Sequence, residues 1–436
     1  MEHILFYVYI KVTLFRTLPE IFFKYKYTKI YYALTTTSSN SYPKIYISTN
    51  GCVGAQLNSK CLENFVKINK LTPTKNVNEA DIVIFYACGL TEDHENKSLQ
   101  IIKNLKTAMK TSAKLVVWGC LSKQNPESLL TLYDGPCIGP LDKTVFEEMF
   151  GKTEISFDDI NFSASGKELE CFRETLMQDN EEKVSLISNT FSLLNKLFDK
   201  IQKKNTPYYI LVATGCTGNC TYCGEKSVFG GIKSRPIEDI IAEFDKGLQL
   251  GYNRFSLLAT DLGAYGIDIN SSLSELLRKI INAQKTENYK LILNQIEPHN
   301  LINIYSDLEE ILTSGKVEEL NSPVQSGSNR ILKLMGRKYT IEEWKNYMFK
   351  IKEKFPDIRL TTQFIVGFPS ETEEDFNETK KLLDSVPFLY NIEVFKYSSR
   401  PTAPSRHMSE QIPEETKKLR KKEFSYARAR NMLRNF

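Results

Sequence analysis

The sequence predicts an α/β protein: an N-terminal parallel-sheet α/β domain over residues 44–150, followed by a partial (β/α)6 barrel over residues 206–410. Short runs of β-branched and aromatic residues alternate with helix-length segments in both regions, as is typical of parallel sheets. Residues 151–205 interrupt that rhythm. A chain of 436 residues with 41% hydrophobic content is long enough for two or three domains with separate cores.

Residues 1–43 form a leader of uncertain order, rich in Phe, Tyr, Ile and Lys and ending in a polar run over 35–41. Charged side chains interrupt its apolar stretches too often for a membrane span of about 20 residues, and no small-residue cleavage site is present. These charged residues are Lys11, Arg16, Glu20, Lys24 and Lys26. We expect no membrane span, and we favour a loosely packed segment over an amphipathic arm on a partner or membrane surface.

In the N-terminal domain, three predicted strands are each followed closely by one cysteine: Cys52, Cys88 and Cys120. The strands cover Lys44–Ser48, Asp81–Tyr86 and Lys114–Trp118. Parallel strands end at one edge of their sheet, so the three thiols are expected at the same edge. Ordinary core cysteines are the alternative, since cysteine is among the most buried residue types. The placement after three successive strands favours a shared site.

Residues 151–205 mix acidic clusters with Lys-rich turns, which indicates a linker or insert of partly helical character. From residue 206 the strand rhythm returns. The predicted strands are Tyr208–Ala213, Arg254–Ala259, Lys290–Asn294, Val317–Leu320, Arg359–Val366 and Ile392–Tyr397. Predicted helices between them include Glu238–Gln249, Ser272–Gln284, Ile341–Lys352 and Glu373–Leu383. Six βα units in order predict an open or partial barrel whose active face is the C-terminal one.

The last segment, residues 411–436, is a basic helix. Its cations are Lys417, Lys418, Arg420, Lys421, Lys422, Arg428, Arg430 and Arg434. Contact with nucleic acid is one interpretation, but a cationic terminal helix is more often a solvated face. The net charge of +4 does not by itself indicate a nucleic-acid partner.

The most specific signal is the spacing Cys-x3-Cys-x2-Cys formed by Cys216, Cys220 and Cys223, which follows the first predicted barrel strand. Three thiolates on one loop can hold three irons of a 4Fe–4S cluster and leave the fourth iron open for a chelating molecule. Structural zinc fits poorly because it needs four ligands, and the four histidines lie elsewhere, at 3, 94, 299 and 407. Nine cysteines, an odd number, and no secretory leader indicate a reducing compartment, the cytoplasm.

Several motifs, in order over about residues 44–410, resemble the radical SAM methylthiotransferase family. The matching segments are Thr49–Cys52 with Asn58–Ser59; Ala80–Asp81 and Ala87–Cys88; Trp118–Cys120; Gly215–Cys223 with Gly230 and Ser234–Pro236; Asp261 with Ala264–Gly266; Pro323–Ser328; Met335 with Arg337; Gly367–Pro369 with Glu371–Thr372; and Tyr397 with Arg400–Pro401. The triplet alone would indicate only the radical SAM superfamily. The second thiol trio upstream makes the resemblance specific.

The resemblance implies two 4Fe–4S clusters, one held by Cys52, Cys88 and Cys120 and the other by Cys216, Cys220 and Cys223. The second would bind S-adenosylmethionine (SAM) and pass one electron to its sulfonium, whose carbon–sulfur bond would break to give methionine and a deoxyadenosyl radical that abstracts hydrogen. The first would carry the sulfur that a second SAM methylates. An electron donor of flavodoxin or ferredoxin type and a monomeric enzyme are expected.

Four further residues are candidates for cofactor binding by motif match. Tyr222 is expected beside the adenine through its backbone, and Asp261, Gln325 and Arg337 near SAM or the substrate. A polar residue at a strand end can instead cap a helix or brace a turn, and this alternative stays open. Cys61, Cys137 and Cys171 match no motif and are expected to be ordinary thiols.

The segment Asp261–Asp268 resembles the branch of the family that acts on threonylcarbamoyl-adenosine beside the tRNA anticodon. Family members continue into a small β-barrel module that grips RNA, and this sequence stops at Phe436, about where that module would begin. A polypeptide substrate is therefore the alternative to tRNA. A non-catalytic iron–sulfur sensor is a remote one. The basic helix, the insert and the aromatic leader are candidates to replace the missing RNA contact.

Overall fold

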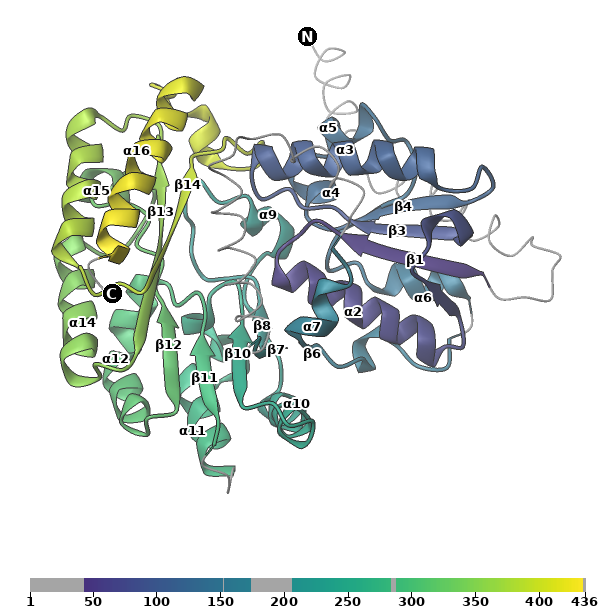
Figure 1. Cartoon of the computed structure of the whole chain (residues 1–436), viewed down its shortest axis with the longest axis horizontal. Helices are drawn as coiled ribbons and strands as arrows, with labels where there is room; N and C mark the ends of the chain where they lie inside the picture. The colour runs from purple at the N-terminus through teal and green to yellow at the C-terminus, as the bar shows by residue number, and fades with distance from the viewer. Residues whose placement is uncertain (1–42, 152, 174–205, 284–287, 434–436) are drawn as a thin grey trace, which may run out of the picture.

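The computed structural model describes residues 43–151, 153–173, 206–283 and 288–433. The predictions for the leader and for most of the insert lie outside these residues. Figure 1 shows two sheets side by side, with helices around each. Among the described helices none is long and apolar enough to cross a membrane.

The N-terminal domain is built on a parallel sheet which, in the described part of the chain, has the order β2-β1-β3-β4-β5. Its strands are β1 (Lys44–Thr49), β2 (Thr72–Thr74), β3 (Ile82–Tyr86), β4 (Lys114–Trp118) and β5 (Cys137–Ile138). Its helices are α2 (Val53–Ile68), α3 (Glu92–Ala108), α4 (Leu121–Gln124), α5 (Pro126–Leu130) and α6 (Thr144–Phe150). The three predicted strands are confirmed. The short strands β2 and β5 were not predicted, because two or three residues carry too little pattern.

Strand β3 shows why this sheet is covered on both faces. All of its residues are buried, and alternate side chains enter different cores. Ile82 and Ile84 belong to a cluster shared with α2 and α6, whereas Val83 and Phe85 belong to a cluster shared with α3. The two-residue period of a strand therefore builds two apolar layers from one continuous apolar run.

The second sheet follows the chain order, β14-β13-β12-β11-β10-β7-β6, within the described ranges. Its parallel strands are β7 (Tyr208–Leu211), β10 (Arg254–Leu258), β11 (Lys290–Leu293), β12 (Val317–Asn321), β13 (Arg359–Val366) and β14 (Asn391–Lys396). The helices that alternate with them or follow are α10 (Ile237–Gln249), α11 (Leu273–Ala283), α12 (Pro298–Thr313), α14 (Ile341–Lys354), α15 (Glu373–Ser385) and α16 (Glu414–Leu433). The first and last parallel strands do not pair, so the predicted partial (β/α)6 barrel is confirmed.

One edge strand of the barrel was missed. Strand β6 (Ser163–Ser165) pairs antiparallel with β7, although it lies in the segment predicted as a linker or insert. Its Ser-Ala-Ser sequence carries no strand signal, so only its tertiary pairing makes it a strand. The remaining described elements are α7 (Gly166–Glu170), β8 (Ala213–Thr214), α9 (Glu225–Phe229), β9 (Lys233–Ser234), α13 (Asn329–Leu334) and the 3-10 turns η1 (Val77–Glu79), η2 (Phe157–Asp159), η5 (Leu262–Ala264), η6 (Ile267–Ile269) and η7 (Pro404–His407).

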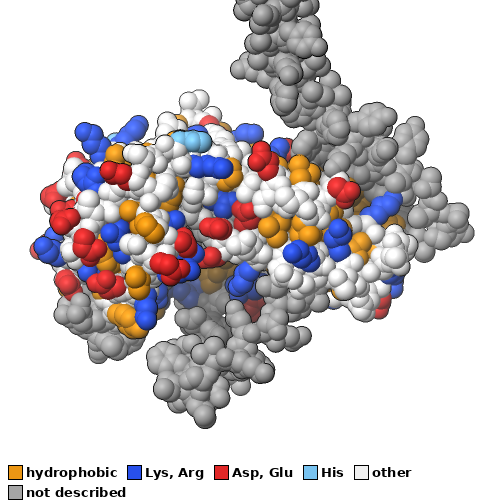
Figure 2. All heavy atoms as spheres, turned by 90° about the horizontal axis from the view of Figure 1, so that it is seen from above, with side chains coloured by type: hydrophobic (Ala, Val, Ile, Leu, Met, Phe, Trp, Pro, Cys, Tyr) orange, Lys and Arg blue, Asp and Glu red, His pale blue; other side chains and the backbone are white. Residues whose placement is uncertain are grey.

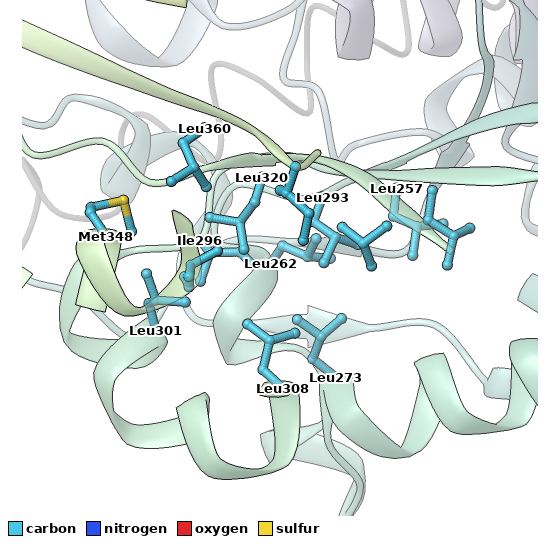
Figure 3. Packing of buried hydrophobic residues seen from close by; sticks show 14 of the residues in the cluster. Leu257, Leu262, Leu273, Leu293, Ile296, Leu301, Leu308, Leu320, Met348 and Leu360 are labelled. Atoms are coloured by element: carbon cyan, nitrogen blue, oxygen red, sulfur yellow. The ribbon is translucent and has the colours of Figure 1, made fainter. Parts of the chain in front are cut away.

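The barrel core lies between the strands and the outer helices. Figure 3 shows leucines of four neighbouring strands close to side chains of the helices and loops that cover them. The strand residues are Leu257, Leu293, Leu320 and Leu360, and each is fully buried. Burying a leucine stabilises the fold by about 1.5–3 kcal/mol. The core thus fixes the strands from which the loops of the C-terminal face project.

Capping residues define where two of the barrel helices begin. Thr340 and Thr372 each accept a hydrogen bond from the third backbone N–H of α14 and α15, and the acidic residue there bonds back to the threonine N–H. This reciprocal capping box explains why the predicted starts at Ile341 and Glu373 are confirmed.

The basic C-terminal helix α16 packs on β14 and α15. Several of its cations are paired: Lys417 with Glu414, Lys418 with Glu415 and Arg420 with the buried Glu371. Figure 2 shows basic and acidic side chains interspersed over the face seen from above. These pairings favour a structural role and a solvated face over a strip of free cations.

Candidate functional site

The first three thiols lie at one edge of the N-terminal sheet. The strand register pairs Thr49 with Tyr86, and Tyr86 with Trp118, so β1, β3 and β4 end level with one another. The cysteines follow these ends: Cys52 is the residue just before α2, Cys88 lies in the loop before α3, and Cys120 is the residue just before α4.

The three sulfurs are close enough to influence one another. The Tyr86 hydroxyl lies 3.6 Å from the Cys120 Sγ. Burial holds the pKa of Cys120 well above its ordinary value, and the neighbouring Cys88 and Cys52 raise it further. Burial likewise raises the pKa of Cys88 to about 12. The trio predicted from the strand ends is therefore brought together.

A small hydrogen-bond network fixes the Cys88 loop. The Cys88 N–H donates to Asn50 Oδ1 at 3.1 Å, and the Ser98 hydroxyl donates to the Cys88 carbonyl at 2.7 Å. Asn50 Nδ2 in turn donates to Ser98 Oγ at 2.9 Å. Because Ser98 lies on α3, the position of the Cys88 loop depends on the position of this helix.

The second trio lies on the loop between β8 and α9. Thr221, within this loop, donates from its N–H to the Met335 carbonyl at 3.0 Å and from its hydroxyl to the Leu334 carbonyl at 2.9 Å. Lys226 Nζ donates to the Cys216 carbonyl at 2.9 Å. These bonds fasten the loop to the end of α13 and to its own first residues.

Gly215 permits the turn that begins this loop, and Gly215→Ala tests it. Its φ is +72°, and a Cβ there would lie 2.0 Å from the Gly231 carbonyl oxygen. The left-handed backbone alone costs a non-glycine residue about 1–2 kcal/mol. We expect Gly215→Ala to lower iron content after anaerobic reconstitution. Gly231→Ala is the control, because its Cβ would meet nothing within 4 Å; equal iron in both variants would contradict this role.

The two trios lie on either side of a contact between the two domains. Helices α4 and α9 contact each other, and α9 lies between the two sheets in Figure 1. Burial raises the pKa of each thiol of the first trio, and the carboxylate of Glu225, just after Cys223, raises all of them further. Glu225, the first residue of α9, is therefore within electrostatic reach of the whole first trio.

The donor set suits iron–sulfur clusters. Backbone N–H groups face the sulfurs, those of Gly54 and Ala55 toward Cys52 and that of Gly218 toward Cys216. Such N–H groups stabilise cluster thiolates. Among the residues that the structure describes, no three His, Cys, Asp or Glu side chains close around a single metal ion. A 4Fe–4S cluster instead takes one thiolate at each of three separate irons.

Arg337 lies directly against the second trio. Its guanidinium donates from Nη1 to the Cys220 Sγ at 3.2 Å and from Nη2 to the Pro323 carbonyl at 2.8 Å. Its side chain is 4% exposed and also pairs with Glu297 at 3.3 Å. Hydrogen bonds to the sulfur ligands tune the potential of a cluster. This placement makes Arg337 a residue of the thiol site, whereas its predicted place near SAM or the substrate stays a prediction.

Asp261 is held by three donors at the end of β10. Its carboxylate accepts from the backbone N–H groups of Gly263 and Glu297 and, at 2.6 Å, from Asn300 Nδ2. Burial raises its pKa to about 6. With these bonds Asp261 stabilises the turn at the start of η5. Its contact with SAM or substrate stays a prediction.

Gln325 and Tyr222 are both built into the scaffold. Gln325 has a φ of +71°, and its backbone bonds to Gln363 and Ile365 of β13. A non-glycine residue in this conformation costs about 1–3 kcal/mol, and such strain clusters at functional sites. The Tyr222 side chain packs against a buried cluster that includes Phe368 and Tyr397. That leaves its backbone as the group for the predicted adenine contact.

The three cysteines outside the trios have local roles. Cys61 is buried and donates to the Asn161 carbonyl at 3.1 Å. Cys137 lies on β5, and the exposed Cys171 lies 3.5 Å from Lys75 Nζ. Sequence reasoning missed Glu297, which caps α12 and pairs with Arg337; its Glu-Pro start was the available signal.

One groove of the described residues lies away from the thiols. It has a volume of about 480 Å³ and opens at the opposite edge of the N-terminal sheet, beside Ile82 and Lys114 at the starts of β3 and β4 and Lys110 after α3. The thiol site is therefore defined by its side chains and loops rather than by this groove.

Two family models match the chain: the "Radical SAM superfamily" over residues 210–383 and "Uncharacterized protein family UPF0004" over residues 44–136. A tRNA-2-methylthio-N(6)-dimethylallyladenosine synthase from Acetivibrio thermocellus is 33% identical over 388 residues, covering 86% of this chain and 75% of the relative. The protein of the same name from Clostridium tetani is 30% identical, covering 87% and 80%.

Solved structures share the fold at low sequence identity. The radical S-adenosylmethionine methyltransferase TsrM from Kitasatospora setae superposes with a TM-score of 0.54 at 11% identity, covering 84% of this chain and 74% of that one. The cobalamin-dependent radical enzyme OxsB gives 0.52 at 13% identity, covering 88% and 56%. Both likenesses concern the fold alone.

Proposed function

The chain belongs to the radical SAM methylthiotransferase family, and on this premise we propose that it transfers a methylthio group to a modified adenosine of tRNA. Family membership makes the protein an enzyme that uses SAM and two 4Fe–4S clusters. The observation that carries the proposal is the pair of neighbouring thiol trios in a chain whose relatives are named as tRNA methylthiotransferases. Those names also favour tRNA over the polypeptide substrate.

The residues of the chain would divide the work as follows. Cys216, Cys220 and Cys223 would hold the SAM-binding cluster, and Cys52, Cys88 and Cys120 the other. When bound, the cluster of Cys216, Cys220 and Cys223 would supply, with SAM, the radical that removes a hydrogen atom, and the cluster of Cys52, Cys88 and Cys120 would supply the sulfur. The protein positions both and excludes water.

Arg337 and an apolar layer would shape the SAM side. The guanidinium donates to Cys220 and would keep a positive charge beside the thiolates of that loop. Behind the loop, Ile331, Met335 and Phe368 are fully buried and would keep water from the cluster.

The adenosine that fits the sequence best is threonylcarbamoyl-adenosine. The segment Asp261–Asp268 resembles that branch, and its loop is fixed to β9: Gly266 N–H donates to Ser234 Oγ, and Asp268 accepts from the Ser234 N–H, each at 2.9 Å. The exposed Ile267 and Ile269 side chains beside these anchors would be free to contact the substrate. The relatives' names favour dimethylallyladenosine as a second candidate.

Nucleoside analysis would decide between these substrates. The reconstituted enzyme, with SAM and a chemical reductant, is incubated with tRNA carrying threonylcarbamoyl-adenosine, with tRNA carrying dimethylallyladenosine, and with unmodified transcript. We expect a methylthio product by mass spectrometry from the first alone. Product from the second alone would move the assignment to that nucleoside. Deoxyadenosine formation without product on any tRNA would refute the tRNA proposal.

A further inference from the structure

A buried ion pair joins the two domains beside the thiols. Arg400, in the loop after β14, donates from Nη2 to Glu95 Oε2 in the first turn of α3. The two side chains are 3% and 8% exposed, and Asn125 Nδ2 donates to the other carboxylate oxygen of Glu95 at 2.8 Å. Removing one partner of such a pair destabilises the contact between the domains, because the other charge is left buried without a partner.

Each partner leads by a short path to one thiol loop. On the N-terminal side, Glu95 lies one turn before Ser98, which donates to the Cys88 carbonyl at 2.7 Å. On the barrel side, the Ser405 N–H donates to the carbonyl of Thr221, between Cys220 and Cys223, at 2.9 Å. The Ser227 hydroxyl on α9 also donates to the hydroxyl oxygen of Thr402, two residues after Arg400, at 3.0 Å.

Glycines let the two loops approach each other around one side chain. Gln124 is 1% exposed. A Cβ at Gly89, just after Cys88, would lie 2.7 Å from its Oε1. A Cβ at Gly224, just after Cys223, would lie 3.2 Å from its Nε2 and 3.4 Å from the Cβ of Arg400. Close packing in this seam means that a shift of either domain displaces a thiol loop.

We propose that Glu95 and Arg400 are positioning residues whose buried pair fixes the separation and orientation of the two cluster sites, and so couples radical formation to sulfur transfer. The proposal rests on the two-cluster chemistry of the proposed function but not on the choice of tRNA as substrate. Neither residue needs to touch SAM, substrate or iron for this role.

The amount of methylthio product formed per deoxyadenosine tests the proposal. In Arg400→Ala and Glu95→Ala we expect wild-type iron content and deoxyadenosine within about twofold. Methylthio product per deoxyadenosine should fall by about a hundredfold, the scale of an ångström-level misplacement. The double variant should be no worse than either single one, because both remove the same contact. Arg400→Lys should recover part of the coupling.

The control is Arg278→Ala, which removes an exposed ion pair with Asp307 and Glu310 and should leave the coupling unchanged. An unchanged product ratio in Arg400→Ala and Glu95→Ala would overturn the proposal. Loss of iron from both sites in these variants and in Arg400→Lys would also overturn it, because the pair would then serve folding alone.

Two readouts do not depend on turnover. Electron paramagnetic resonance of the doubly reduced protein should show a weaker spin–spin interaction between the clusters in Arg400→Ala than in wild type. In the metal-free protein, amide hydrogen exchange should rise in segments 92–98 and 398–405. An unchanged interaction would refute the positioning role. If wild type methylthiolates no tRNA, the substrate proposal fails and the spin–spin comparison still decides this one.

Discussion

Cys223→Ser is expected to abolish both deoxyadenosine formation and methylthio transfer. Cys223 is a thiol of the loop predicted to hold the SAM-binding cluster, and burial raises its pKa to about 12 in the metal-free protein, so iron must displace a tightly held proton. Iron–sulfur clusters prefer soft thiolate ligands, so the harder serine hydroxyl is a poor replacement. Because the cofactor carries the chemistry, both products should fall by more than about a thousandfold in anaerobic assays.

The control for this variant is Cys171→Ser, which changes an exposed thiol outside both trios. It should retain wild-type yields of both products. Deoxyadenosine production by Cys223→Ser at the wild-type rate would remove the second trio from the SAM site.

Cys88→Ser is expected to separate the two activities. Methylthio transfer should fall by more than about a thousandfold, because sulfur delivery depends on the first cluster, while SAM cleavage to deoxyadenosine continues. Both products are measured in one reaction by liquid chromatography with mass spectrometry. Survival of both would show that Cys52, Cys88 and Cys120 do not hold a catalytic cluster.

The matched control is Cys61→Ser. Cys61 is buried in the same domain and donates to the Asn161 carbonyl, a bond that a serine hydroxyl preserves. It should leave both activities intact. If it instead reproduced the loss seen in Cys88→Ser, the effect would report damage to the domain rather than to a cluster.

The two sulfur trios were predictable because their signals are local. Cys216, Cys220 and Cys223 share one short loop, and Cys52 and Cys88 each follow a strand whose apolar run is plain in the sequence. Parallel strands end at the same edge of their sheet, so no special residue is needed to bring thiols that follow neighbouring strands to that edge.

The contacts between the domains were not predictable. Glu95 and Arg400 are 305 residues apart, and nothing in either local sequence indicates the other. Strand β6 was missed for a related reason, since only pairing with β7 makes its Ser-Ala-Ser a strand. Asp261 shows a third limit: its place at a strand end was evident, but the three donors that hold its carboxylate come from the fold.

Iron content and cluster spectra of trio variants test the central claim most directly. The protein as purified and reconstituted should bind about eight irons per chain as two 4Fe–4S clusters. Alanine at Cys52, Cys88 and Cys120 together, or at Cys216, Cys220 and Cys223 together, should each leave about four irons and one cluster signal. Wild-type iron in either triple variant, with unchanged thermal unfolding, would contradict the claim that each trio holds its own cluster.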